Sequence, residues 1–274
     1  MADVFIGSEA VAAGLLTRGK LRWNYRAIFP DVYIAKEASA SLFDRITGAW
    51  LWSGRRAVIA GLSAAVLHGS HLVDESAPVE LIWRCGRPPP GIVVRNERIE
   101  PDEVAEVSGL AVTTPGRTAL DVARHADRNT AVTHLDALAC AKDLTAADVR
   151  PLTDRYRGAP GVRRSVTALD LMDGGSKTPM ATMVRLHLVD AGFPVPRTQI
   201  SVDDGTTAAV VEMGYEAPMV GVEFGGDASK SLTRLGWTII CGEGKNPLTI
   251  VYLMRAAVIE RGFPLYRLQR MSRY

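Results

Sequence analysis

The sequence predicts an α+β protein made of several small units, and three observations support this class. Capped segments with helical spacing, such as 115–125, alternate with short apolar runs that are typical of strands, such as 79–83 and 92–95. Of the residues, 47% are hydrophobic and 23% are charged, the balance of a globular protein with buried cores. The length of 274 residues exceeds that of one usual domain, so we expect two or three domains.

A short winged-helix-like module is expected at residues 1–40. Ser8 and Thr17 suit the N-caps of two short helices, Gly14 ends the first helix, and residues 32–35 form a single strand or one arm of a hairpin. Helix, turn, helix and a short β element is the order of a winged helix-turn-helix, whose second helix enters the major groove of DNA. The order therefore predicts a DNA-binding module.

Four basic side chains lie on or beside the second of these helices. Arg18, Arg22 and Arg26 stand four residues apart and would share one helix face, and Lys20 flanks them. The segment 10–30 contains no Asp or Glu. Two interpretations are open: the four side chains contact DNA, or they form the solvated face of an ordinary helix. The order of elements favours DNA.

Residues 41–173 predict a mixed α/β region. Two helical stretches are expected within 42–69, the second of them a buried helix at 57–68 that is nearly all small or apolar. Further strands and helices are expected at 79–83, 92–95, 111–113, 115–125, 130–142, 146–156 and 162–171. The Asp-Gly-Gly-Ser segment 173–176 is the clearest linker in the chain and predicts a domain boundary.

One ion pair is expected in this region. Thr114 and Pro115 form an N-cap and N1 pair that opens a helix. Arg117 and Asp121 then lie at i,i+4 on that helix, and we interpret the pair as structural rather than catalytic.

Residues 176–274 predict a small α/β sandwich. The expected elements are a helix at 179–191, strands at 199–202, 208–213, 219–224 and 237–241, and a closing helix at 247–260.

Two carboxylates, Glu212 and Glu223, interrupt otherwise apolar strands of this domain, and a charge in such a place needs a reason. If residues 215–218 form a four-residue hairpin loop, Glu212 faces Gly221 and both acids lie on one face as diagonal neighbours. Their β-carbons would then be roughly 7 Å apart.

Two interpretations of this acid pair are open. Oxygen ligands of this kind suit Mg²⁺, which can activate a water for attack on a phosphodiester. Alternatively, one acid pairs with an arginine such as Arg185 or Arg234, and the other lies at a solvated edge. A shift of one residue in the loop would send the two acids to opposite faces of the sheet.

Bulk charge and cysteine use exclude several classes of protein. The formal net charge is +2, from 32 Lys and Arg against 30 Asp and Glu, so any basic surface must be local. Cys85, Cys140 and Cys241 lie far apart, which argues against a zinc site or a disulfide framework. No stretch approaches about 18 uncharged apolar residues and no signal peptide is visible, so we expect a cytoplasmic protein without membrane contact.

The C-terminal part resembles the DUF559 group of PD-(D/E)xK nuclease folds, which is similar to very-short-patch-repair endonucleases. The matching stretches are residues 178–186 (TPMATMVRL), 191–194 (AGFP), 211–215 (VEMGY), 222–227 (VEFGGD) and 235–237 (LGW). The resemblance implies a restriction-endonuclease-like α/β domain at 176–274.

The upstream part resembles the AbiEi-type antitoxin regulators of type IV toxin–antitoxin systems. The matching stretches are residues 63–69 (SAAVLHG) and 112–121 (VTTPGRTALD). This resemblance implies a DNA-binding regulator with a cognate toxin or another defence-operon protein as its partner.

The catalytic positions of the nuclease family are only partly kept. The family carries Glu where this chain has Ala181, Asp where it has Glu212, and Asp where it has Gly225. Glu223 survives, and Asp227 is close enough to be considered. Too few oxygens then remain to hold Mg²⁺ against its water shell, so we expect a pseudo-nuclease that needs no cofactor.

The favoured function is therefore that of a DNA-binding regulator in which Arg18, Lys20, Arg22 and Arg26 contact DNA. The C-terminal domain would supply shape, homodimer contacts or further backbone binding. One alternative is a divergent Mg²⁺-dependent DNA endonuclease that uses Glu212, Glu223 and Asp227, with Glu212 and Glu223 as metal ligands. The second alternative is a protein-binding partner in a defence operon.

Overall fold

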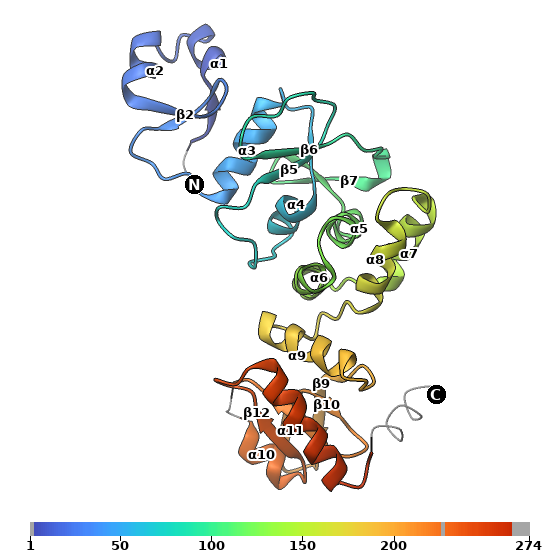
Figure 1. The fold of residues 1–274 in the computed structure, drawn as a ribbon. Coiled ribbons are helices and arrows are strands. Elements are labelled where there is room, and N and C mark those ends of the chain that lie inside the picture. Colours follow the sequence, from blue (N-terminus) through green and yellow to red (C-terminus); the bar gives the residue numbers. More distant parts are fainter. Residues whose placement is uncertain (1–2, 226–227, 265–274) are drawn as a thin grey trace. The chain divides into compact units, whose positions relative to one another are not determined.

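The computed structural model describes residues 3–225 and 228–264, and the chain divides into two compact units, residues 1–170 and 171–274 (Figure 1). The first unit contains β1 (Phe5–Ile6), α1 (Gly7–Ala12), α2 (Arg18–Asn24), β2 (Tyr25–Phe29), β3 (Val32–Ala35), α3 (Leu42–Trp52), β4 (Val58–Ile59), α4 (Gly61–Leu67), β5 (Val79–Ile82), β6 (Ile92–Arg95), the 3₁₀ helix η1 (Pro101–Glu103), β7 (Val104–Val107), β8 (Leu110–Thr113), α5 (Pro115–His125), α6 (Arg128–Lys142), α7 (Ala146–Arg155) and α8 (Val162–Asp170). The second contains α9 (Pro179–Asp190), β9 (Arg197–Asp203), β10 (Ala208–Tyr215), β11 (Val220–Glu223), α10 (Ser229–Arg234), β12 (Thr238–Cys241) and α11 (Pro247–Glu260). Eleven α-helices and three sheets in the described ranges confirm the α+β class.

The first sheet has the strand order β1–β3–β2 and is built on the N-terminal hairpin. β2 and β3 pair antiparallel, and β1 pairs with the other edge of β3. Helix α3 packs against all three strands, with Ile46 fully buried beside Phe29 and Val32. Ser41 and Asp44 close a capping box at the start of α3, which fixes where this helix begins.

The second predicted helix is shorter than expected. Thr17 caps α2 as predicted, but the helix ends at Asn24 because Tyr25 is extended, with φ −129° and ψ 155°. Tyr25 and Arg26 both pair with β3, so the hairpin takes the residues that would have continued the helix. The expectation that Arg26 shares a helix face with Arg18 is therefore wrong.

A five-stranded sheet with the order β6–β5–β4–β8–β7 lies at the centre of the middle region. Its central strand β4 pairs antiparallel with β5 and parallel with β8. The single helix expected at 57–68 is therefore wrong, since β4 takes its first residues and α4 begins only at Gly61. Ile59 is fully buried between Leu81 and Val112, and this central position explains why a short apolar run forms a strand there.

Helices α5, α6, α7 and α8 follow the sheet and pack on one another (Figure 1). Thr114 caps α5 and Pro115 stands in its first turn, as predicted. Asp127 caps α6, and Thr145 closes a capping box on α7. The helix starts in this region therefore follow from capping chemistry that the sequence displays.

The second unit is a four-stranded sheet with the order β12–β11–β10–β9. β9, β10 and β11 form an antiparallel meander, and β12 joins it parallel to β11. Helices α9 and α11 share one core with Met213 and Val222, and α10 contributes Leu232 to a second core with Ile200 and Trp237. The predicted order of helix, meander, strand and helix is present, with α10 as an unpredicted addition.

Candidate nucleic-acid interface

Helix α2 presents three of the four predicted DNA-contacting side chains to solvent. Arg18, Lys20 and Arg22 are all exposed, and α2 has no buried residue. Within the described part of the chain, none of the three forms an ion pair or a side-chain hydrogen bond. Their positive charges are therefore available to an anionic partner.

The way α2 is held explains how such an exposed helix keeps its shape. A helix of 7 residues is not stable alone, because nucleation costs more than so few hydrogen bonds return. The Thr17 hydroxyl accepts from the Lys20 N–H at 3.2 Å, and Leu21 lies against Gly7 of α1, where a β-carbon would be 3.0 Å from its methyl group. The cap and this contact fix α2 while its basic side chains stay free.

Arg26 lies on β2 rather than on α2. Its Nη2 donates to the Ala38 carbonyl at 2.9 Å, and the side chain stays exposed. The structure thus groups Arg18, Lys20 and Arg22 on one short helix and places Arg26 on the strand that follows it directly.

Trp23 is a surface feature of α2 that the sequence reasoning did not single out. Its relative exposure is 74%, which is high for an indole. Its position next to Arg22 was visible in the sequence, but its exposure was not.

A buried network of charges occupies the middle region. Arg117 is fully buried; its Nε donates to Asp121 at 2.9 Å, and its Nη1 donates to Glu103. The ring of Tyr156 lies 4.8 Å from the guanidinium carbon of Arg117, and the Tyr156 hydroxyl donates to Glu103 at 2.8 Å. Arg155 also pairs with Glu103, at 2.6 Å. The predicted pair of Arg117 and Asp121 is confirmed, but no sequence pattern indicated that Glu103 and Tyr156 complete it.

Burial and neighbouring charges together shift two carboxyl pKa values of this network in opposite directions. Burial raises the pKa of Asp121 to about 6, although Arg117 opposes the shift. Burial alone would also raise the pKa of Glu97, but His125 and Arg124 outweigh it and lower that pKa to about 2. Glu97 therefore stays ionised well into the acid range.

Glu97, Asp121 and His125 also come close enough to suggest a metal site. One ligand atom from each lies within 4.8 Å of the others. However, Arg117 and Arg124 already approach these carboxylates, with Arg124 Nη1 at 2.8 Å from Glu97. Two guanidinium groups supply the positive charge that a cation would bring, so this donor set does not fit a metal ion.

The register of the C-terminal hairpin differs from the predicted one. Gly214 faces Gly221 and Met213 faces Val222, because the strand β10 runs on to Tyr215. The expectation that Glu212 faces Gly221, with the two acids as diagonal neighbours, is therefore wrong. The antiparallel pairing of the two strands runs from Tyr215 and Val220 to Met213 and Val222 and stops short of Glu212.

The two acids bind backbone groups of this region. The Glu212 Oε1 accepts from the Phe224 N–H at 3.1 Å and from the Gly225 N–H at 3.3 Å. The Glu223 Oε1 accepts from the Ala228 N–H at 3.1 Å, and Glu223 is 5% exposed.

The other positions of the resembled nuclease motif add no further acid among the described residues. Ala181, on α9, is buried in the core that α9 shares with α11. The third candidate acid, Asp227, lies outside the described residues. Arg185 is fully buried and donates to the Ser176 hydroxyl at 3.0 Å, which places it at the start of the unit.

Comparison with known proteins agrees with the antitoxin resemblance of the middle region. Residues 57–173 match the family model described as the AbiEi antitoxin C-terminal domain. This segment holds the five-stranded sheet from β4 onward, the buried charge network and helices α5 to α8.

Two curated proteins of Mycobacterium tuberculosis are also similar. The uncharacterized proteins MT2308 and Rv2248 are each 27% identical to the chain over 180 residues. The match covers 63% of this chain and 62% of each relative, so the chain spans less than two thirds of the length of these relatives.

Among the described residues, every helix is too short or too polar to cross a bilayer.

Proposed function

We propose that this protein is a DNA-binding regulator that resembles the antitoxins of type IV toxin–antitoxin systems. The observation that carries the proposal is α2, a helix with no buried residue that presents Arg18, Lys20 and Arg22 to solvent. A short helix that adds nothing to a core, yet is capped and held in place, is suited to contact another molecule. Contacts from arginine and lysine to phosphates supply most of the affinity in such an interface.

The surrounding elements support a winged-helix-like use of residues 1–40. Helices α1 and α2 precede the hairpin of β2 and β3, the order in which a winged helix-turn-helix presents its second helix to the major groove. Arg26, on β2, would contact the backbone from the hairpin rather than from the helix. Residues 41–173 would form the antitoxin-like region, which gives this module its position.

For residues 176–274 we propose a nuclease-like domain without cleavage activity. The Oε1 of Glu212 already accepts hydrogen bonds from two backbone N–H groups, which compete with a metal ion for this oxygen. Ala181 lies in the core, where the resembled family carries a glutamate. With so few oxygen ligands, a hard divalent cation would keep its water shell. This domain would then serve DNA backbone contacts or homodimer contacts.

The partners of this regulator would be DNA and a protein encoded near it. The match of residues 57–173 to an antitoxin domain supports a cognate toxin as that protein.

DNA binding can be tested by a gel-shift titration with the DNA upstream of the gene at several salt concentrations. The double variant Arg18→Ala and Arg22→Ala should bind more weakly, and the slope of log affinity against log salt should fall by about two. Arg84→Ala and Arg87→Ala form a matched control, because both are exposed arginines of the same unit. Equal affinity and slope in wild type and the folded α2 variant would reject the assignment.

The absence of cleavage can be tested by incubating the protein with supercoiled plasmid over a range of Mg²⁺ and Mn²⁺ concentrations. No nicking is expected from the wild type. Nicking that Glu223→Gln abolishes would favour the alternative of a divergent endonuclease. The triple variant Ala181→Glu, Glu212→Asp and Gly225→Asp restores the ligand types of the family, and metal-dependent nicking by it would support descent from a nuclease.

A further inference from the structure

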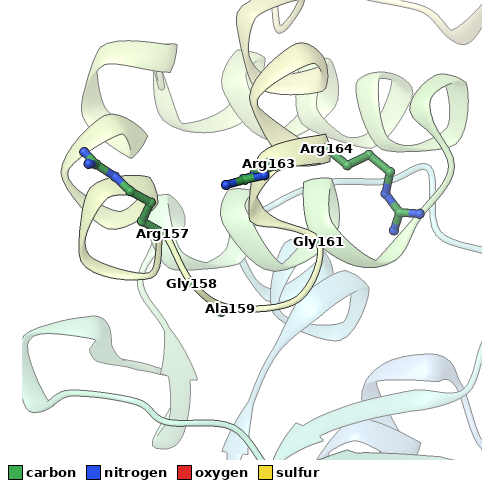
Figure 2. A pocket seen from close by; sticks show the side chains of 6 residues that line it. All are labelled: Arg157, Gly158, Ala159, Gly161, Arg163 and Arg164. Carbon is green, nitrogen blue, oxygen red and sulfur yellow. The ribbon is translucent and has the colours of Figure 1, made fainter.

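The loop between α7 and α8 forms a basic pocket on the first unit. The pocket has a volume of about 460 Å³ and is lined by Arg157, Gly158, Ala159, Gly161, Arg163 and Arg164. Figure 2 shows the three arginines at the two ends of this short loop, with Arg163 between the other two. Half of the lining residues are arginines, and none is acidic.

The positive charge of this pocket is largely uncompensated. Arg163 is exposed and has no ion pair or hydrogen bond with any described residue. Arg164 is anchored through its Nη2 to the Arg124 carbonyl at 2.6 Å, which orients the side chain but leaves its charge unbalanced. Arg157 pairs with Asp154 at 2.9 Å, but these side chains are 81% and 62% exposed, so water screens the pair.

Contacts with helix α5 fix the conformation of the loop between α7 and α8. Arg124, on α5, donates from its Nε to the Pro160 carbonyl at 3.0 Å. Gly161 has a φ of 83°, and a β-carbon there would lie 2.8 Å from the Arg124 carbonyl oxygen, so only glycine fits this close approach. Gly158, in contrast, faces open space. The pocket is therefore a fixed concave surface that a ligand can approach closely.

We propose that this pocket binds phosphate groups of the DNA backbone, which makes it a second DNA contact of the same unit that carries α2. Guanidinium groups match phosphate oxygens with two parallel hydrogen bonds, and three arginines line this pocket, spread along its rim so that they could contact successive phosphates (Figure 2). The lining contains only arginine, glycine and alanine, without an aromatic or long apolar side chain on which a base could stack. The contact is therefore independent of DNA sequence. This inference rests on the proposed function.

The test compares two double variants on a short DNA duplex of unrelated sequence, where only backbone contacts contribute. Arg157→Gln with Arg163→Gln should lower affinity roughly tenfold at 0.1 M salt and reduce the salt slope by about 1.8, or about 0.9 for each lost phosphate contact. Arg84→Gln with Arg87→Gln removes the same charge from exposed positions of the same unit and should leave the slope unchanged. The charge-preserving pair Arg157→Lys and Arg163→Lys should recover most of the slope and only part of the affinity.

The outcomes distinguish failure of the pocket from failure of the proposed DNA-binding function. A reduced slope in the pocket variant alone supports the pocket. If the pocket variant equals wild type while Arg18→Ala with Arg22→Ala still weakens binding, the pocket is wrong and the proposed function stands. An equal loss in the control variant means that only overall charge matters, and the pocket is again wrong. If wild type retains no DNA at low salt, the proposed function fails, and the pocket loses its ligand with it.

Discussion

Arginine has opposite roles in two regions of the first unit. In the middle region, Arg117 is fully buried and engages Asp121, Glu103 and Glu97. On α2, Arg18 is exposed and engages no described residue. The residue type is the same, so the difference lies in the carboxylates that surround it and in its access to water.

Burial and pairing distinguish the arginines that stabilise the fold from those that can bind a ligand. A buried guanidinium must be paired, because an isolated charge in a core costs several kcal/mol. An exposed one without a partner contributes little to the free energy of unfolding and is free to bind a ligand. Removing a charge should therefore affect stability in one region and DNA affinity in the other, and the predictions below test this in order of decreasing effect on stability.

The largest effect is expected for Arg117→Met. The variant removes the guanidinium that Glu103 and Asp121 share. Glu103 keeps Arg155 at 2.6 Å, but the fully buried Asp121 keeps only the more distant Arg124 at 3.6 Å, so the free energy of unfolding should fall by about 3–5 kcal/mol. Denaturant unfolding measures this loss in the transition of the first unit. The matched control is Arg98→Met, since the Arg98 side chain is 70% exposed and forms an exposed ion pair with Glu100, and the control should cost less than about 1 kcal/mol. Similar losses in both variants would remove the distinction between the two regions.

The second prediction concerns acid stability through Glu97. Its pKa is about 2 in the folded protein against an ordinary 4.5, because His125 and Arg124 outweigh burial. A lowered carboxyl pKa gives stability that is complete above pH 4.5 and is lost as the pH falls toward 2, worth up to about 3 kcal/mol. Glu97→Gln should therefore flatten the loss of stability below pH 4.5.

Asp121 changes the pH dependence of stability in the opposite direction to Glu97. Its pKa is raised to about 6 by burial, so stability falls as the pH rises from 3.8 to about 6. The charge of Glu97 contributes to this rise in the pKa of Asp121, so Glu97→Gln should also weaken the fall in stability between pH 3.8 and about 6, and the effect of Glu97 itself is measured below pH 3.8. Identical profiles in the two proteins would contradict the assignment.

The third prediction is a smaller loss for Tyr156→Phe. The hydroxyl donates to both oxygens of Glu103, at 2.9 and 2.8 Å, and hydrogen bonds to a charged group are worth about 1.5–3 kcal/mol. Glu103 keeps Arg117 and Arg155 as partners, so we expect a loss of about 1–2 kcal/mol. Denaturant unfolding at neutral pH measures it, and a loss equal to that of Arg117→Met would mean that the hydroxyl stabilises the buried carboxylate as much as the guanidinium does.

Some helix starts could be predicted from the sequence because their chemistry is local, whereas Ser8, the expected N-cap of the first helix, lies inside α1, which begins at Gly7. Thr114 with Pro115 and Asn246 with Pro247 are cap and N1 pairs, and α5 and α11 begin there. The end of α2 could not be predicted, because it depends on the pairing of Tyr25 with β3. Pairing with a distant strand overrides the local preference for helix.

The parts of the candidate sites that escaped prediction depend on distant residues or unusual turns. Glu103 reaches Arg117 from 14 positions away, and nothing in the sequence near Glu103 marks it as a partner. In the C-terminal hairpin, Met219 adopts a φ of 54° and joins the turn. Methionine rarely adopts this left-handed conformation, so its residue type does not indicate a turn position. This turn shifts the register of the hairpin, so that Gly214 rather than Glu212 faces Gly221.

The smallest effect on stability, and an effect of opposite sign on binding, is expected for Asp154→Asn. Asp154 is the carboxylate that competes with DNA for Arg157, in an exposed pair that contributes almost nothing to folding. Its removal should change the free energy of unfolding by less than about 0.5 kcal/mol. It should also raise affinity for a duplex of unrelated sequence roughly two- to threefold, since each acid near a phosphate repels it. Glu106→Gln is the matched control, because Glu106 is an exposed acid of the same unit that does not line the pocket. A gain that appears in both variants would reflect net charge, whereas a gain in Asp154→Asn alone would mark Arg157 as a residue that phosphate and carboxylate share.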